Sequence, residues 1–213
     1  AELVVGEIGR ALGLPVPEIV FVELDPVLGR AEPDPEIQSL VTASAGLNLA
    51  LDYLPGALDF DPRLTPPPDE GLASAIVWFD AYVTNVDRTP RNTNMLTWHK
   101  RLYLVDHGAA LYFHHDWSDY VARSRTPFPQ IKEHVLLPFA GALRETDAVL
   151  SAQLTPSVID AVVALIPDDW LGDEPAFAGP AEHRAAYAAY LLNRLEAPRA
   201  FVEEAIDARA RLV

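Results

Sequence analysis

NVDRTPRNTNML (residues 85–96), with LVDHG (residues 104–108) shortly after it, is the stretch from which the rest of the chain can be interpreted. It places three oxygen-bearing side chains, Asp87, Asn92 and Asp106, within a short length of sequence. Asp87 and Asn92 lie five positions apart on what we expect to be one loop. The spacing predicts a cluster that can bind a small cation or handle a proton.

The segment between these residues has the pattern of a β-hairpin. Residues 94–98 and 102–105 are largely apolar, and the polar residues 99–101 separate them. Two short apolar runs joined by a polar turn are typical of paired antiparallel strands. A hairpin folds the chain back on itself, so we expect Asp106 to lie beside Asn92.

The side chains in this cluster suit phosphoryl transfer. Asn92 and Asp106 offer oxygen ligands for Mg²⁺, which takes few protein ligands and keeps waters and phosphates. Asn94 is a reserve ligand two positions from Asn92. Asp87 stands where a base can accept a hydroxyl proton. Asp and Asn are also common in ordinary turns, and a purely structural role is the alternative.

Taken together, these motifs resemble those of the HipA-like serine/threonine kinases and, more distantly, of the phosphoinositide 3/4-kinase-like lipid kinases. Arg88 follows Asp87 here, whereas eukaryotic protein kinases place the Arg before the catalytic Asp. Thr89 replaces the His of the lipid kinases, and His107 replaces the Phe of the metal-binding triplet, which leaves coordination by Asp106 intact.

The resemblance implies transfer of the γ-phosphoryl group of ATP to a Ser or Thr hydroxyl, with Mg²⁺ as the metal. In that scheme Asp87 is the base or orients the hydroxyl, and Arg88 stabilises the loop or the transferred phosphoryl group. Asn92 and Asp106 hold the metal. These are expectations carried over from the family.

The resemblance also implies an α+β, protein-kinase-like fold with two lobes. We expect residues 1–56 to be the remainder of a smaller, β-containing N-terminal lobe and residues 57–213 to be a mainly helical lobe. The pattern predicts strands over residues 17–24 and 47–54, and the latter ends at Asp52, Tyr53 and Leu54, where a kinase hinge would bind adenine.

The start of the chain is predicted to be helical, because Val4, Ile8 and Leu12 recur at helical spacing. The resemblance makes Glu2 the counterpart of the helix Glu that pairs with a phosphate-contacting Lys. Neither Lys100 nor Lys132 stands where that Lys would be. We therefore expect that an upstream nucleotide-lobe segment is missing from this chain, which would then be inactive alone. A favourable acid in the first helical turn is the structural alternative for Glu2.

Other segments have patterns without an evident chemical role. Residues 25–40 and 118–130 are predicted to be loops, and residues 57–69 an exposed linker. A largely apolar helix is expected over residues 69–84, with Asp80 on its polar edge. The remainder is predicted to be helical. There we expect a turn at residues 168–170 and Arg184, Arg194, Arg199, Arg209 and Arg211 on solvated faces.

Composition and charge exclude several classes of function. The chain has 213 residues and a formal net charge of −15, with 31 acidic against 16 basic residues. A nucleic-acid groove or an anionic membrane surface needs the opposite sign. There is no cysteine and no apolar stretch of transmembrane length. Cytoplasmic residence is the default expectation.

Two other functions remain open at this stage. One is a degenerate kinase fold that binds a partner without turnover, and the other is a kinase for a small molecule or lipid. Family members act in toxin–antitoxin pairs, but these residues support neither a toxin role nor an antitoxin partner. His114 and His115, with Asp116, form a weak candidate for zinc binding, since adjacent side chains point in different directions.

Overall fold

The chain divides into two compact units in the computed structural model, which describes residues 1–63, 66–172 and 174–212. The smaller unit is residues 17–55, and the larger unit joins residues 1–16 to residues 56–213. Residues 1–16 were assigned to the smaller lobe from the sequence, but they pack with the larger unit. Both units mix helices and strands, which agrees with the α+β class.

The smaller unit contains a two-stranded antiparallel sheet. Strand β1 (Ile19–Leu24) pairs with β2 (Gly46–Leu51), in a register that places Ile19 opposite Leu51. The segment between them is not the loop that we expected, because it contains a 3-10 helix, η1 (Pro26–Ala31), and helix α2 (Pro35–Ala43). Asp34 caps α2 by accepting the backbone N–H groups of Glu36 and Ile37.

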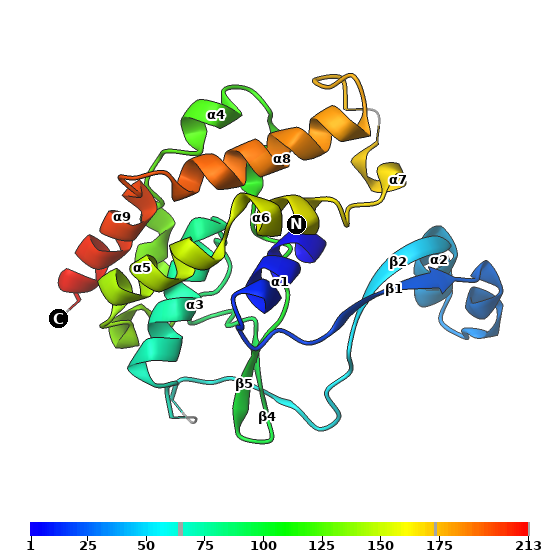
Figure 1. Ribbon diagram of the computed structural model, residues 1–213. Coiled ribbons are helices and arrows are strands. Elements are labelled where there is room, and N and C mark those ends of the chain that lie inside the picture. The colour runs from blue at the N-terminus through cyan, green and yellow to red at the C-terminus, as the bar shows by residue number, and fades with distance from the viewer. Residues whose placement is uncertain (64–65, 173, 213) are drawn as a thin grey trace. The chain divides into compact units, whose positions relative to one another are not determined.

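The larger unit is built around α3 (Glu70–Tyr82), the predicted apolar helix (Figure 1). Asp69 caps its first turn by accepting the backbone N–H of Leu72 at 2.9 Å. Trp78 and Tyr82 are fully buried, and their rings stack with centroids 5.3 Å apart. Helix α3 packs against α5 (Leu143–Gln153) and α9 (Ala200–Ala210), so it forms the centre of the helical core.

The predicted hairpin is confirmed. Strand β4 (Met95–Trp98) pairs with β5 (Arg101–Leu104) in antiparallel register. His99 and Lys100 form the turn with φ values of 47° and 64°, and positive φ at both central residues is typical of type I′ hairpin turns. A third strand, β3 (Leu58–Asp59), pairs with β4, and Phe60 beside it is buried. The segment predicted to be an exposed linker is therefore partly folded onto the hairpin.

Further helices complete the larger unit. Helix α1 (Glu2–Ala11) lies against α6 (Pro156–Val163), and α6 lies against α8 (Pro180–Leu195). The predicted loop at residues 118–130 contains a short helix, and the turn at residues 168–170 is helical. The remaining elements are α1 (Glu2–Ala11), η2 (Tyr112–His115), α4 (Tyr120–Arg123), η3 (Pro129–Glu133), η4 (Leu137–Phe139), α6 (Pro156–Val163), α7 (Asp168–Leu171) and α8 (Pro180–Leu195). No helix within the described ranges is long and apolar enough to cross a membrane.

The C-terminal end of α3 is held by Arg194, which the sequence analysis wrongly placed on a solvated face. Arg194 is 2% exposed and donates to the carbonyl oxygens of Tyr82 at 2.8 Å and Ala81 at 2.9 Å. Its Nη1 donates to the carbonyls of Ser124 at 3.0 Å and Thr126 at 3.2 Å. A cation at a helix C-terminus is favoured by the helix dipole. Arg194 thus ties α3 to the segment after α4.

We expect Arg194→Met to lower the free energy of unfolding by about 3 kcal/mol, because it leaves buried carbonyl groups without donors. Arg211→Met is the matched control, since Arg211 is exposed, and its effect should stay within about 0.5 kcal/mol. Urea denaturation followed by circular dichroism measures both. Equal stability of the two variants would contradict the role given to Arg194.

Candidate functional site

The loop after α3 carries Asp87 and folds into a tight turn. The backbone N–H of Thr89 donates to the carbonyls of Asp87 at 3.0 Å and Asn92 at 2.9 Å. The backbone N–H of Val105 donates to the carbonyl of Asn94 at 3.1 Å, so the hairpin brings the chain back beside this loop. Asn92, Asn94 and Asp106 line one cavity of about 430 Å³. The predicted proximity of Asn92 and Asp106 is therefore confirmed.

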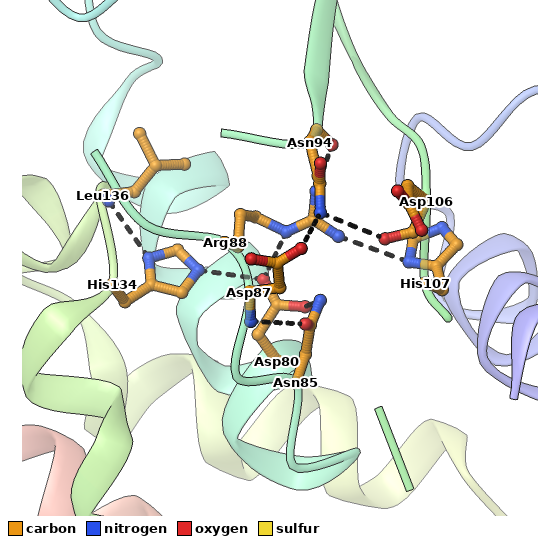
Figure 2. A network of polar contacts seen from close by, with 9 residues as sticks. All are labelled: Asp80, Asn85, Asp87, Arg88, Asn94, Asp106, His107, His134 and Leu136. Carbon is orange, nitrogen blue, oxygen red and sulfur yellow. Dashed lines mark hydrogen bonds and ion pairs between the residues drawn. The ribbon is translucent and has the colours of Figure 1, made fainter. Parts of the chain in front are cut away.

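The carboxylate of Asp87 is oriented by two amides. Its Oδ2 accepts the side-chain Nδ2–H of Asn92 at 2.7 Å. It also accepts the Nδ2–H of Asn94 at 3.1 Å, and Figure 2 shows Asn94 beside Asp87. The backbone N–H of Asp87 donates to the Oδ1 of Asn85 at 3.1 Å. These contacts leave Oδ1 of Asp87 without a hydrogen bond to a described residue. It is the oxygen with which Asp87 can accept a proton.

Asp80 and Arg88 form a fully buried ion pair beneath this loop. Arg88 donates from Nε to the Oδ2 of Asp80 at 2.6 Å, and both side chains are 0% exposed. Asn85 donates to the other oxygen of Asp80 at 3.0 Å. Burial opposes ionisation of Asp80, but the charge of Arg88 and a hydrogen bond from His134 hold its pKa below the ordinary value. Asp80 therefore does not lie on a polar edge as predicted, although its expected structural role is supported.

Arg88 also joins the loop to the hairpin. Its Nη1 donates to the carbonyl of Asn94, and its Nη2 lies 3.2 Å from Nδ1 of His107. Because Arg88 is 1% exposed and fully paired, its surroundings favour loop stabilisation over contact with a transferred phosphoryl group.

The two histidines of this network are fixed as neutral tautomers by their partners. The backbone N–H of Leu136 donates to Nδ1 of His134 at 3.0 Å, so the proton is on Nε2, which lies 2.8 Å from Asp80. Arg88 has only donors, so Nδ1 of His107 is the acceptor. Burial and the charge of Arg88 lower the pKa of His107 to about 3.

Glu2 contacts the segment that carries Asp106. Its Oε2 accepts the backbone N–H of His107 at 2.5 Å, which links α1 to the turn after β5. Its Oε1 is buried and has no hydrogen-bond partner among the described residues. Burial raises the pKa of the Glu2 carboxyl, although the hydrogen bond from His107 opposes the rise. A buried carboxylate oxygen in this position is suited to a cationic partner.

Asp52, Tyr53 and Leu54, the expected adenine-binding residues, belong to the smaller unit. The strand was expected to reach residue 54, but β2 ends at Leu51, so these three residues follow it directly. Asp52 is placed by its backbone N–H, which donates to the carbonyl of Glu18 at 2.8 Å. Their role in nucleotide binding is taken up below as a proposal.

The donor set at the cavity fits Mg²⁺. Asn92 uses its amide nitrogen to contact Asp87, so its Oδ1 can act as a ligand, and Asp106 supplies a carboxylate. Asp106 and Asn94 have φ values of 54° and 46°, an uncommon conformation that clusters at functional sites. The described residues contain no group of three His, Cys, Asp or Glu side chains that could hold a metal. Mg²⁺ does not need one, because phosphates and waters supply most of its ligands.

His114 has a packing role. Its Nδ1 lies 3.0 Å from the hydroxyl of Tyr187, and its ring adjoins that of Phe113. Phe113 in turn stacks on Tyr190 with centroids 3.5 Å apart. These contacts secure η2 to α8.

Sequence reasoning named Asn92, Asn94 and Asp106, which line the cavity, but missed the residues that support them. Asp80, His107 and His134 were not recognised as one network with Arg88. A signal was present, since Asp80 is an acid within the apolar part of α3, beyond its first turn, where a buried charge requires a partner. Its partners could not be identified from spacing, because His134 lies 54 positions further along the chain.

The stability of the protein should depend on pH through His107. Below about pH 6.5 the unfolded chain binds a proton at this position, whereas the folded chain stays neutral down to about pH 3. The stabilisation that the neutral, buried His107 contributes is complete above about pH 6.5. It is lost as the pH falls from about 6.5 to about 3. Between pH 7 and pH 5 the loss should be about 2 kcal/mol.

His107→Asn tests this dependence, because the Asn Oδ1 can still accept from Arg88 but does not titrate. The free energy of unfolding should vary less with pH in this variant than in wild type, as measured by urea denaturation at pH 7 and pH 5. His115→Asn, at an exposed position, should keep the wild-type dependence. The same pH dependence in all three proteins would contradict the assignment.

Comparison with known proteins agrees with the resemblance seen in the motifs. The family model described as HipA-like kinase matches residues 1–204. No curated protein and no solved structure matches the chain. The match includes Asp87, Asn92 and Asp106, and kinase membership implies use of ATP, usually with a divalent metal, and a hydroxyl substrate. The chain belongs to the HipA-like kinase family.

Proposed function

We propose that this protein transfers the γ-phosphoryl group of ATP to a Ser or Thr hydroxyl in an Mg²⁺-dependent reaction. The observation that carries the proposal is the arrangement at the 430 Å³ cavity. Asn92 and Asp106 line this cavity and offer two oxygen ligands, and the amide of Asn92 also holds the carboxylate of Asp87. Phosphoryl transfer depends mainly on positioning and electrostatic stabilisation, which such a cluster can provide.

Asp87 is the proposed catalytic residue. Its Oδ1 accepts the proton of the attacking hydroxyl or orients that hydroxyl, while Oδ2 is held by Asn92 and Asn94. Asn94 was expected to be a reserve metal ligand, but its amide contact supports a role in positioning Asp87. Arg88 acts from beneath the loop by fixing its backbone.

Asn92 and Asp106 would hold the metal through their side-chain oxygens. When bound, Mg²⁺ would offset the negative charge that develops on the phosphates. The chain has a formal net charge of −15, so a metal also reduces the repulsion between the protein and ATP.

We further propose that two elements outside the cavity take part in nucleotide binding. The segment Asp52-Tyr53-Leu54 would then supply hinge groups for adenine. Glu2 would use its unpartnered Oε1 to bind the Lys that positions the phosphates. The contact from Glu2 to the backbone of His107 supports this proposal, because it places the carboxylate next to the turn that carries Asp106.

A degenerate kinase fold without turnover is the second candidate. The observation that favours it is that no lysine among the described residues pairs with the buried Oε1 of Glu2, a contact that the first candidate requires. Lys100 lies in the hairpin turn and Lys132 in η3, so neither of the two lysines in this sequence pairs with it. Calorimetric titration of the full-length protein with MgATP separates the candidates, because a degenerate module that has lost the nucleotide site would not bind.

Asp87→Asn and Asp106→Asn should each lower the rate of phosphoryl transfer by at least about 100-fold in the full-length protein. Asp87→Asn removes the proton acceptor and should retain MgATP binding. Asp106→Asn removes a charged metal ligand and should weaken MgATP binding. Radiolabelled phosphate transfer and calorimetry measure the two effects.

The control variant is Asp160→Asn, an exposed acid on α6. It removes the same charge without touching the cavity, so its transfer rate should match wild type. Normal turnover in Asp87→Asn or in Asp106→Asn would overturn the catalytic assignment.

A further inference from the structure

A second cavity adjoins the candidate active site. It has a volume of about 650 Å³, within the range typical of ligand-binding pockets. Pro90 and Arg91 line both this cavity and the one that contains Asn92 and Asp106. The two cavities therefore meet at the turn of the catalytic loop, and we refer to the second one as the loop groove.

The loop groove has cationic and apolar lining. Arg91 from the loop and Lys132 from η3 are both exposed and make no ion pair or side-chain hydrogen bond to a described residue. Several other arginines of this larger unit pair with carboxylates, as in Arg144 with Glu203 and Arg199 with Asp147. Two unpaired cations at one groove are therefore a local departure from the strongly acidic character of the chain.

The remaining lining limits the kind of ligand. Val135, Pro138 and Leu212 provide apolar surface, and Glu133 provides one carboxylate. With Glu133 opposing two cations, the groove has only a small excess of positive charge. An apolar surface with this modest charge fits a polypeptide that carries an acidic side chain near an apolar one better than it fits a polyphosphate.

The floor of the groove is rigidly connected to the catalytic loop. The backbone N–H of Val135 donates to the carbonyl of Arg88 at 3.1 Å. His134, next to Val135, is buried and held by Asp80. A ligand in the groove would therefore have a fixed position relative to Asp87, which is a requirement for a substrate-positioning surface.

We propose that the loop groove binds an acidic segment of the protein substrate, next to the Ser or Thr that receives the phosphoryl group. This inference rests on the proposed kinase function and specifies its substrate class. Arg91 and Lys132 determine specificity by pairing with substrate carboxylates, and they take no part in the chemistry.

The test uses fluorescein-labelled peptides with one Ser in an Ala- and Gly-based background. Each peptide of the first set carries a single Glu, placed at one of the positions from four residues before the Ser to four residues after it. In the matched set, Gln replaces that Glu. Binding to the full-length protein is measured by fluorescence anisotropy, and phosphate transfer is measured on the same peptides. The proteins compared are wild type, the double variant Arg91→Glu with Lys132→Glu, and Lys100→Glu, which reverses an exposed charge in the hairpin turn.

Wild type should bind the best Glu peptide about tenfold more tightly than its Gln counterpart, as expected for two partly exposed charge pairs. The double variant should lose this preference, and Lys100→Glu should keep it. Equal binding of Glu and Gln peptides by wild type, or retention of the preference by the double variant, would overturn the inference. The inference would also be overturned if the double variant lost affinity for ATP but kept its preference for Glu peptides, because the groove would then bind the nucleotide.

Failure of the proposed function gives a different result. If the acidic preference in binding is present but no peptide or partner is phosphorylated, the groove is a binding surface and the kinase proposal fails. If MgATP binds and phosphate is transferred without regard to acidic residues, the kinase proposal stands and the groove inference fails.

Discussion

The buried ion pair between Asp80 and Arg88 is the interaction on which the candidate site depends. It connects the end of the central helix to the first residues of the catalytic loop, and both charges are fully removed from water. Breaking such a pair by removing one partner typically costs about 3–5 kcal/mol, because the other charge is left uncompensated. Asn85 and His134 contact the oxygens of Asp80, and His107 and the carbonyl of Asn94 contact Arg88, so each nitrogen and oxygen of the two paired side chains has a partner.

This arrangement explains how an exposed loop can hold a carboxylate in a defined orientation. Arg88 is anchored to Asp80 on one side and to the backbone of Asn94 on the other. Asp87, its neighbour in sequence, therefore stays close to the hairpin that leads to Asp106. The cavity residues are supported by a rigid network in the interior, as precise positioning in catalysis requires. The same network supports the floor of the loop groove through His134 and Val135.

The parts of the fold that local patterns determine could be predicted, and those that depend on distant partners could not. The hairpin followed from two apolar runs and a polar turn, and α3 followed from its apolar stripe. Helix α2 was missed, although Asp34 and Pro35 give the usual signals of a helix start, because it buries none of its side chains. Arg194 was misplaced because its partners, Ala81 and Tyr82, lie more than 100 positions away in the chain. In the site, short spacing identified Asp87, Asn92 and Asp106, whereas the supporting histidines required the folded structure.

A crystal structure of the full-length protein with a non-hydrolysable ATP analogue and Mn²⁺, with anomalous diffraction recorded at the manganese edge, tests the central claim most directly. Mn²⁺ takes the place of Mg²⁺ and can be located independently of the protein. The account predicts an anomalous peak at coordination distance, about 2.1 Å, from side-chain oxygens of Asn92 and Asp106, with phosphate oxygens completing the shell. A well-ordered nucleotide with manganese bound elsewhere would contradict it.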